Sequence, residues 1–181
     1  MTLATSALLV IDVQNEVVAS AHERDAVVAN IGRAIDHART TGLPVIWVQH
    51  SDEGLLLNSD GWQIVNELQP GDGEPRIHKL YRSSFESTEL DDVLENLQIT
   101  ALYICGAETN NCVRWTSLGA LERGFDVFIL SDAHTTNAFE WQHGLLSAQQ
   151  IIDEFNANMH RLQLPGRTSD LVSTESFCTL G

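Results

Sequence analysis

Short apolar runs alternate along the chain with segments whose apolar residues recur at helical spacing. Continuous apolar runs at 7–11, 45–48, 101–105 and 127–130 predict strands that are buried on both faces. Weaker patterns predict short strands at 76–80 and 171–172. Helical spacing of apolar residues predicts helices over 27–38, 89–97, 113–123 and 145–162. Asp25 precedes the first of these helices and Gly42 ends it.

This order of elements predicts an α/β fold. Strands that alternate with helices pair in parallel through right-handed crossovers, which gives a three-layer αβα sandwich with a mainly parallel sheet. The length of 181 residues fits a single domain over 1–181. Residues 51–75 are irregular and rich in Gly and Pro, and so long a connection is usually a functional loop or a lid.

The composition excludes several classes of partner. The formal net charge of −15 disfavours nucleic acid and anionic membranes, because both attract basic surfaces. The apolar runs are too short to span a bilayer, and no secretory signal is visible. Three cysteines without a CxxC pair do not suggest a disulfide framework, so we expect a reducing, cytoplasmic setting.

Three reactive side chains follow predicted strands. In parallel α/β sheets, ligands bind outside the carboxyl ends of the strands. Asp12 ends the first strand, Lys79 ends the third, and Cys112 opens the helix that follows the strand at 101–105. A helix N-terminus and a nearby lysine lower the pKa of a thiol, which predicts a reactive Cys112. A carboxylate could accept the thiol proton and return it to a leaving group.

Each of these residues also has an ordinary interpretation. A lone cysteine is usually a small core residue, and an aspartate after a strand often forms a turn or caps a helix. A lysine is most often a solvated surface charge. Placement alone therefore leaves the catalytic interpretation open.

Four sequence blocks resemble one family. Residues 9–14 (LVIDVQ), 79–90 (KLYRSSFESTEL), 106–113 (GAETNNCV) and 131–133 (SDA) follow the order found in isochorismatase-like cysteine hydrolases. That superfamily includes nicotinamidases, N-carbamoylsarcosine amidases and streptothricin hydrolases. The resemblance covers nearly the whole chain and does not specify a substrate.

The resemblance implies a catalytic triad of Asp12, Lys79 and Cys112. It also implies a cis peptide bond at Ala107–Glu108 and an oxyanion hole formed by the backbone amides of Glu108 and Cys112. The activity implied is hydrolysis of a C–N bond (amide, lactam or carbamoyl) in a small molecule through a thioester, without a cofactor. Members of the family commonly form homo-oligomers, so we expect a dimer or a larger assembly.

Two departures from the relatives narrow the activity. Nicotinamidases carry an Asp-x-His motif and a second His that bind a metal, whereas here His50 and Asp52 are followed by Gly54 where the motif requires His. We therefore predict no metal. Members that cleave the vinyl ether of isochorismate tend to lack the cysteine, so Cys112 favours C–N hydrolysis. The alternatives are an isochorismatase-type hydrolase acting on a non-amide substrate and a non-catalytic oligomeric binding member.

Six further residues are candidates for substrate contact, and each also suits a structural role: His50, Trp62, Tyr81, Phe85, Trp115 and His134. Tyr81, Phe85 and Trp115 each fit the core better than the pocket, and Trp62 could form a pocket wall or pack against another subunit. Glu108 places an acidic side chain beside the expected oxyanion hole. That side chain could contact a cationic substrate, or it could face solvent or a partner subunit.

Overall fold

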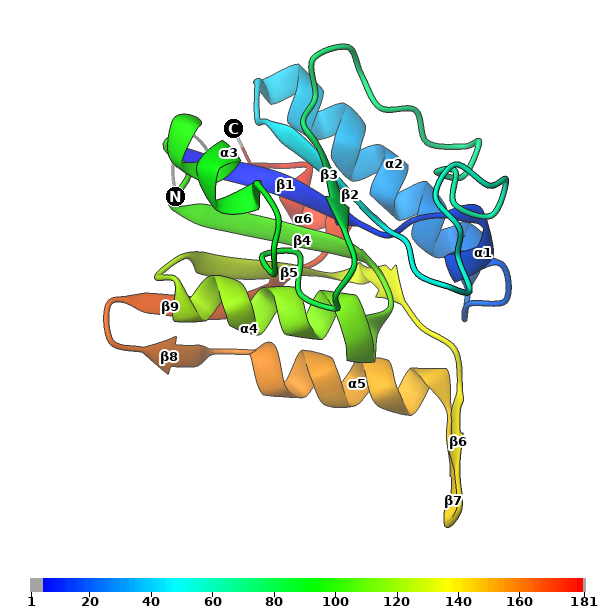
Figure 1. Ribbon diagram of the computed structural model, residues 1–181. Helices are drawn as coiled ribbons and strands as arrows, with labels where there is room; N and C mark the ends of the chain where they lie inside the picture. The colour runs from blue at the N-terminus through cyan, green and yellow to red at the C-terminus, as the bar shows by residue number, and fades with distance from the viewer. Residues whose placement is uncertain (1–4, 181) are drawn as a thin grey trace.

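The computed structural model describes residues 5–180, which form a seven-stranded sheet (Figure 1). The strands lie in the order β3-β2-β1-β4-β5-β9-β8. All neighbouring strands in this sheet pair in parallel except β8 and β9. The strand bounds are β1 Ser6–Ile11, β2 Val45–His50, β3 Arg76–Lys79, β4 Ala101–Ala107, β5 Asp126–Thr135, β8 Leu162–Leu164 and β9 Arg167–Val172.

Helices cover both faces of the sheet, which confirms the predicted three layers (Figure 1). Along β1, Leu8 and Val10 pack into one core, and Leu9 and Ile11 pack into the other. This alternation explains the unbroken apolar run, since both faces of the strand are buried. The first core includes α2 (Arg24–Thr41) and α6 (Thr174–Phe177); the second includes α3 (Leu90–Asn96), α4 (Arg114–Glu122) and α5 (Ala148–Met159).

The ends of α2 follow the sequence signals closely. Gly42 adopts φ 74°, and its N–H donates to the carbonyl oxygens of Ala38 and Arg39. A glycine tolerates this left-handed conformation without a steric penalty, which explains why the helix ends there. Asp25 lies in the first turn of the helix rather than before it.

The helix predicted over 145–162 is wrong at its start. Gly144–Leu146 is strand β7, which pairs antiparallel with β6 (Phe139–Trp141), and α5 begins only at Ala148. Ser147 caps this helix, because its Oγ accepts from the N–H of Gln150 at 3.2 Å. The Gln150 side chain in turn accepts from the N–H of Ser147 at 3.0 Å, which completes a capping box.

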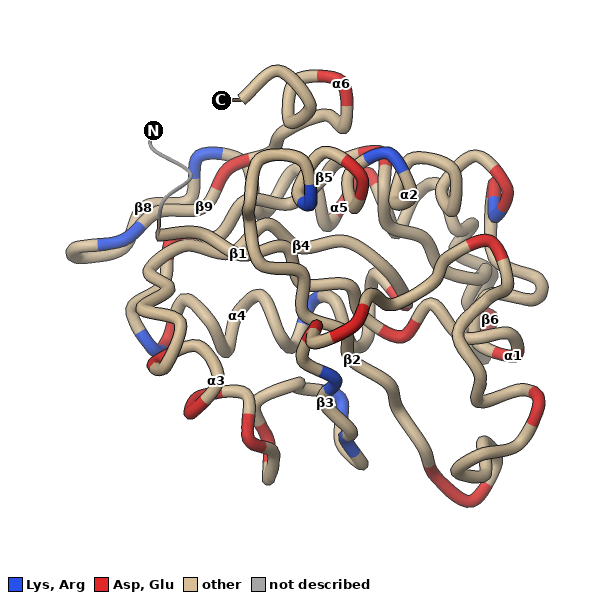
Figure 2. The backbone as a smooth tube through the Cα atoms, turned by 90° about the horizontal axis from the view of Figure 1, so that it is seen from above, with Lys and Arg blue, Asp and Glu red and all other residues tan. Residues whose placement is uncertain are grey.

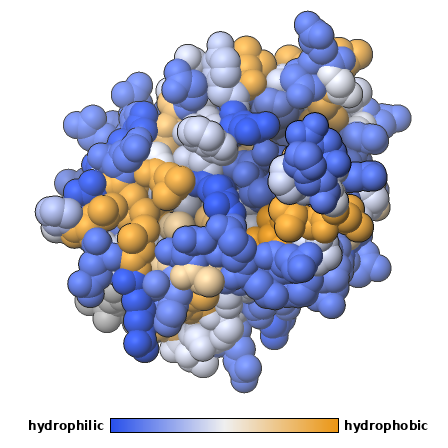
Figure 3. Space-filling model, turned by 90° about the horizontal axis from the view of Figure 1, so that it is seen from below, coloured by the Kyte–Doolittle hydropathy of each residue, from blue (hydrophilic) through white to orange (hydrophobic). Residues whose placement is uncertain are grey.

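The β6–β7 hairpin projects from the body of the molecule (Figure 1). Four of its apolar side chains are largely exposed, with exposed fractions between 44% and 64%: Phe139, Trp141, Leu145 and Leu146. Seen from below, apolar residues gather in several areas among the polar ones (Figure 3). The predicted homo-oligomer stays a prediction.

The connection between β2 and β3 is irregular, as predicted, and it is tied to the end of β1. The Val65 N–H donates to the Val13 carbonyl at 3.1 Å, and the Asn15 N–H donates to the Gln63 carbonyl at 2.9 Å. Asn15 begins the short helix α1 (Asn15–Val18). These bonds hold the loop beside the carboxyl end of β1.

Acidic residues lie on helices and loops around the whole molecule, and basic residues are fewer (Figure 2). Among residues 5–180, none of the helices is long and apolar enough to cross a membrane.

Gly106 provides a test of how tightly β1 and β4 approach. A Cβ on Gly106 would lie 2.0 Å from the Ile11 carbonyl oxygen, and its φ is 118°. We expect Gly106→Ala to lower the free energy of unfolding by at least about 3 kcal/mol, because the backbone must move. Urea denaturation measures this loss.

Gly124→Ala is the matched control, since Gly124 also has a positive φ, 96°, with no atom within 4 Å of a built Cβ. It should cost only about 1 to 2 kcal/mol. Equal losses in the two variants would contradict the close approach.

Candidate active site

The side chains of Asp12, Lys79 and Cys112 meet at the carboxyl ends of the central strands. The Lys79 Nζ lies 2.7 Å from Asp12 Oδ2 and 3.1 Å from Cys112 Sγ. Asp12 follows β1, Lys79 ends β3, and Cys112 comes shortly after β4. Asp12 and Lys79 are each only 1% exposed. The parallel sheet thus brings together three residues that are far apart in the sequence.

A cis peptide bond and a π-helical turn carry Cys112 to this position. The Ala107–Glu108 peptide bond is cis, at the position that the family resemblance implied. The next turn, Thr109–Val113, is π-helical and leads directly into α4. The sequence analysis expected Cys112 to open an α-helix; instead it lies within this wider turn, which often occurs at functional sites.

The electrostatics of Cys112 correct the expectation of a low thiol pKa. Burial raises the pKa of Cys112 to about 12, with a further increase from the Asp12 charge and a partial decrease from Lys79. The resting side chain is therefore a neutral thiol. To act as a nucleophile, this thiol would need a base that takes its proton.

Asp12 is placed to be that base. Burial raises the pKa of the Asp12 carboxyl above its usual range, and Lys79 partly offsets this increase. Burial alone would lower the pKa of Lys79, but the nearby Asp12 and Cys112 side chains raise it. Lys79 thus keeps its positive charge between these two neighbours.

Side chains at the end of β5 hold the turn that carries Cys112. The Glu108 carboxylate accepts from the amide groups of Asn111 at 2.8 Å and Asn137 at 3.1 Å. The Thr136 hydroxyl donates to Asn110 Oδ1 at 2.6 Å. These contacts answer the question left open for Glu108: its side chain is engaged within the protein. The supporting role of Thr136 and Asn137 was not predicted from the sequence, because the apolar run that marks β5 stops at residue 130.

His134 is part of the same support. It is 2% exposed, and its Nδ1 and Nε2 lie 2.9 Å from Thr109 Oγ1 and Asn156 Oδ1. Burial lowers the pKa of His134 to about 4, so the imidazole is neutral. Both ring nitrogens are used, which corrects its assignment to the pocket.

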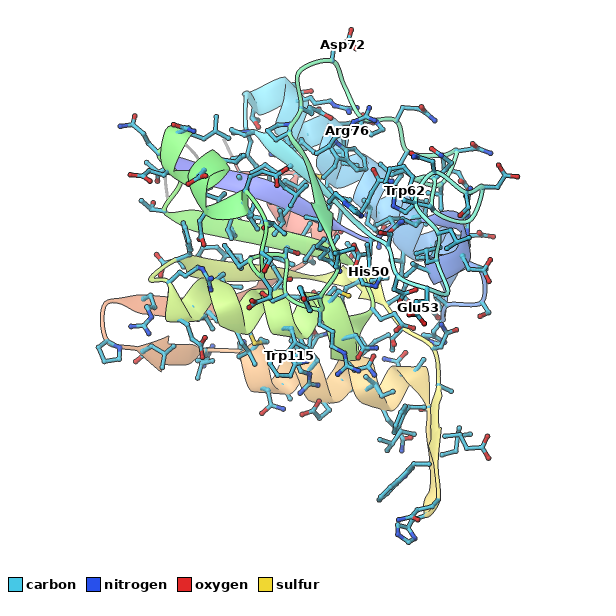
Figure 4. The ribbon with its side chains drawn as sticks, in the orientation of Figure 1. His50, Glu53, Trp62, Asp72, Arg76 and Trp115 are labelled. Atoms are coloured by element: carbon cyan, nitrogen blue, oxygen red, sulfur yellow. The ribbon has the colours of Figure 1, made fainter. Side chains whose placement is uncertain are left out.

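The predicted aromatic contacts separate into buried and exposed residues. Phe85 is 4% exposed and stacks on Phe125 with ring centroids 6.2 Å apart, so it belongs to the core and its assignment to the pocket is corrected. Tyr81 and Trp115 are about half exposed. Trp62 lies in the 51–75 loop. Trp115 lies on α4, at a distance from the end of β2 that bears His50 (Figure 4).

His50 ends β2 beside Lys79, with which it is paired in the sheet register. Gln14 fixes its backbone: the Gln14 side chain donates to the His50 carbonyl at 3.0 Å and accepts from its N–H at 2.8 Å. The His50 Nε2 lies 3.1 Å from Asp52 Oδ2. These two side chains have the chemistry of metal ligands, but within residues 5–180 no three His, Cys, Asp or Glu side chains are grouped to hold an ion.

The reactivity of the thiol tests these electrostatics. If Asp12 takes the proton of this buried thiol, Asp12→Asn should slow alkylation of Cys112 by iodoacetamide at pH 8, by at least about tenfold. Lys79→Met should slow the reaction. Cys178→Ser serves as the background, and peptide mass spectrometry follows Cys112. An unchanged or faster rate in Asp12→Asn would show that the carboxylate does not act as the base for this thiol.

Comparison with known proteins places this geometry in a family. The family model for the isochorismatase domain matches residues 6–155. The isochorismatase family protein YddQ of Bacillus subtilis is 27% identical over 175 residues, which cover 92% of this chain and 97% of YddQ. A streptothricin hydrolase of Streptomyces noursei is 32% identical over 136 residues, 72% of this chain and 54% of that protein. A ureidoacrylate amidohydrolase of Methylobacterium radiotolerans is 28% identical and covers 72% of this chain and 67% of its own length.

The fold agrees with this result. The crystal structure of an isochorismatase from Pseudomonas putida KT2440 matches with a TM-score of 0.87 and 28% identity, covering 97% of this chain and 91% of that one. The chain therefore belongs to the isochorismatase family of hydrolases.

Proposed function

We propose that this protein is a cysteine-dependent hydrolase that cleaves a C–N bond in a small amide, lactam or carbamoyl compound. Hydrolases of its family include members that act on amides. The observation that carries the proposal is the Lys79 ammonium within 2.7 Å of Asp12 and 3.1 Å of Cys112. This arrangement supplies a nucleophile, a base and a compensating charge in one buried site.

Acylation begins with attack by Cys112 Sγ on the substrate carbonyl carbon. As the S–C bond forms, the thiol proton passes to the Asp12 carboxylate, and the carbonyl π electrons move to oxygen. The backbone N–H groups of Glu108 and Cys112 would hold this oxyanion. Among the described residues, no acceptor takes the Glu108 N–H, which supports its use for this purpose.

Collapse of the tetrahedral intermediate breaks the C–N bond. Asp12 gives its proton to the departing nitrogen, and the amine leaves a thioester on Cys112. Water then attacks the thioester while Asp12 takes a proton from it, and that proton returns to the Cys112 sulfur as the acid leaves. Lys79 stays protonated throughout and balances the negative charge that moves between Asp12 and sulfur.

The proposed function also has consequences for cofactors, substrate contacts and assembly. No cofactor is needed for these steps. Trp62 and Tyr81 are candidates to face the substrate, and Trp115 is a weaker one, because it lies apart from the His50 end of β2. We also propose a cytoplasmic homo-oligomer, whose assembly state light scattering would measure.

Replacement of the nucleophile tests the function directly. The purified protein is screened for release of ammonia or amine from a panel of small amides, lactams and carbamoyl compounds. We expect Cys112→Ala to lower the rate on any compound turned over by at least about a thousandfold, because covalent catalysis is lost. Cys112→Ser should lose most of the activity.

Cys178→Ala is the control, since Cys178 lies in the C-terminal segment far along the chain from the site and should not affect turnover. Activity that survives in Cys112→Ala would refute the cysteine mechanism. A wild-type protein that turns over no compound in the panel would favour the non-catalytic binding member.

A further inference from the structure

His50 is held rigidly at the edge of the site by Asp52. The Asp52 Oδ1 accepts the backbone N–H groups of Gly54 at 2.8 Å and Leu55 at 2.9 Å, and its Oδ2 lies 3.1 Å from His50 Nε2. These donors, the His50 contact first, lower the pKa of Asp52 below its usual value. Asp52 is therefore an ionised carboxylate, which can only accept hydrogen bonds.

This contact decides which nitrogen of His50 bears the hydrogen. Because Asp52 cannot donate, Nε2 must carry the hydrogen that joins them, and in the neutral imidazole Nδ1 then keeps its lone pair. The Nδ1 atom is buried and has no hydrogen-bond partner among the described residues. A buried acceptor without a donor is costly, so this atom is suited to receive a donor from a bound molecule.

His50 lies beside the residues that are proposed to transfer the proton. His50 is paired with Lys79 in the register of β2 and β3, and the Lys79 ammonium contacts both Asp12 and Cys112. Figure 4 shows His50 at the end of its strand, with Glu53 nearby on the loop that follows. In the proposed reaction, Asp12 delivers a proton to the leaving nitrogen of the substrate. An N–H group on that nitrogen would therefore lie near the Nδ1 atom of His50.

We propose that His50, fixed by Asp52 in the Nε2–H tautomer, accepts a hydrogen bond from the N–H of the scissile amide and selects amides over esters. This inference rests on the proposed function and adds the group that recognises the leaving nitrogen. An amide nitrogen that carries hydrogen can donate to Nδ1, whereas an ester oxygen cannot. Sites built to bind one polar group discriminate strongly against analogues that lack it.

Asp52→Asn reverses the polarity of His50 without changing its shape. The Asn Oδ1 can still accept from Gly54 and Leu55, so the turn is retained. Its NH2 group would face Nε2 and donate to it, which moves the hydrogen of the neutral imidazole to Nδ1. The acceptor offered to the substrate becomes a donor.

The measurement is the ratio of kcat/KM for the best amide of the panel to kcat/KM for its methyl ester. We expect this ratio to fall at least about tenfold in Asp52→Asn. Glu53→Gln removes the neighbouring exposed carboxylate and should leave the ratio unchanged. The 15N chemical shifts of the His50 ring, at a pH of about 8, report the tautomer independently of activity.

The two proposals fail in different ways. Amide hydrolysis with an unchanged ratio in Asp52→Asn, or an Nδ1–H tautomer in the wild-type protein, would overturn the role of His50 and leave the cysteine mechanism intact. If the wild-type protein hydrolyses no amide, the proposed function fails and this inference fails with it. An Nε2–H tautomer that switches in Asp52→Asn, together with the lower ratio, supports it.

Discussion

The ion pair between Lys79 and Asp12 is the constraint on which the site depends. Both side chains are 1% exposed, and moving two charges out of water costs several kcal/mol per ion. Only a short, well-aligned pair can offset that cost, and the two charged atoms are 2.7 Å apart. The strands β1 and β3, which are separated by β2, must therefore end at the same level of the sheet.

The same pair explains how a neutral thiol can serve as a nucleophile. In the proposed mechanism, Asp12 and Cys112 share one proton, and Lys79 contacts both side chains. Whichever of the two is ionised, its negative charge stays beside the same ammonium. Transfer of the proton then needs little rearrangement of the surroundings, which is the advantage of a preorganised site. The raised thiol pKa is consistent with this sharing, since the proposed mechanism uses Asp12 as the base that takes the proton during attack.

Much of this arrangement could be predicted from the sequence, because it follows from the order of the strands. The continuous apolar run that ends at Asp12 and the weaker pattern around Lys79 mark parallel strands, and the carboxyl ends of such strands meet at one edge of the sheet. The support for the nucleophile could not be predicted in this way. It requires β5 to continue past its apolar run and to pair His134 with Gly106 after an irregularity in register. No periodicity marks that continuation.

Two other errors have local causes. Leu145 and Leu146 continue the helical spacing of α5, but the capping box at Ser147 starts the helix after them. That signal is present in the sequence and was outweighed by the apolar pattern. The burial of Phe85 depends on its packing against Phe125 and under the Arg123 guanidinium, which lies 4.4 Å from the ring centroid. Such contacts arise only once α3 and α4 are in place.

Detection of the acyl-enzyme would test the central claim most directly. The protein is mixed with an amide that it turns over, quenched with acid during the reaction, and examined by peptide mass spectrometry. The account predicts an adduct on Cys112 whose mass is that of the substrate less the departing amine. Turnover without an adduct, or an adduct on another residue, would contradict a thioester formed by Asp12, Lys79 and Cys112.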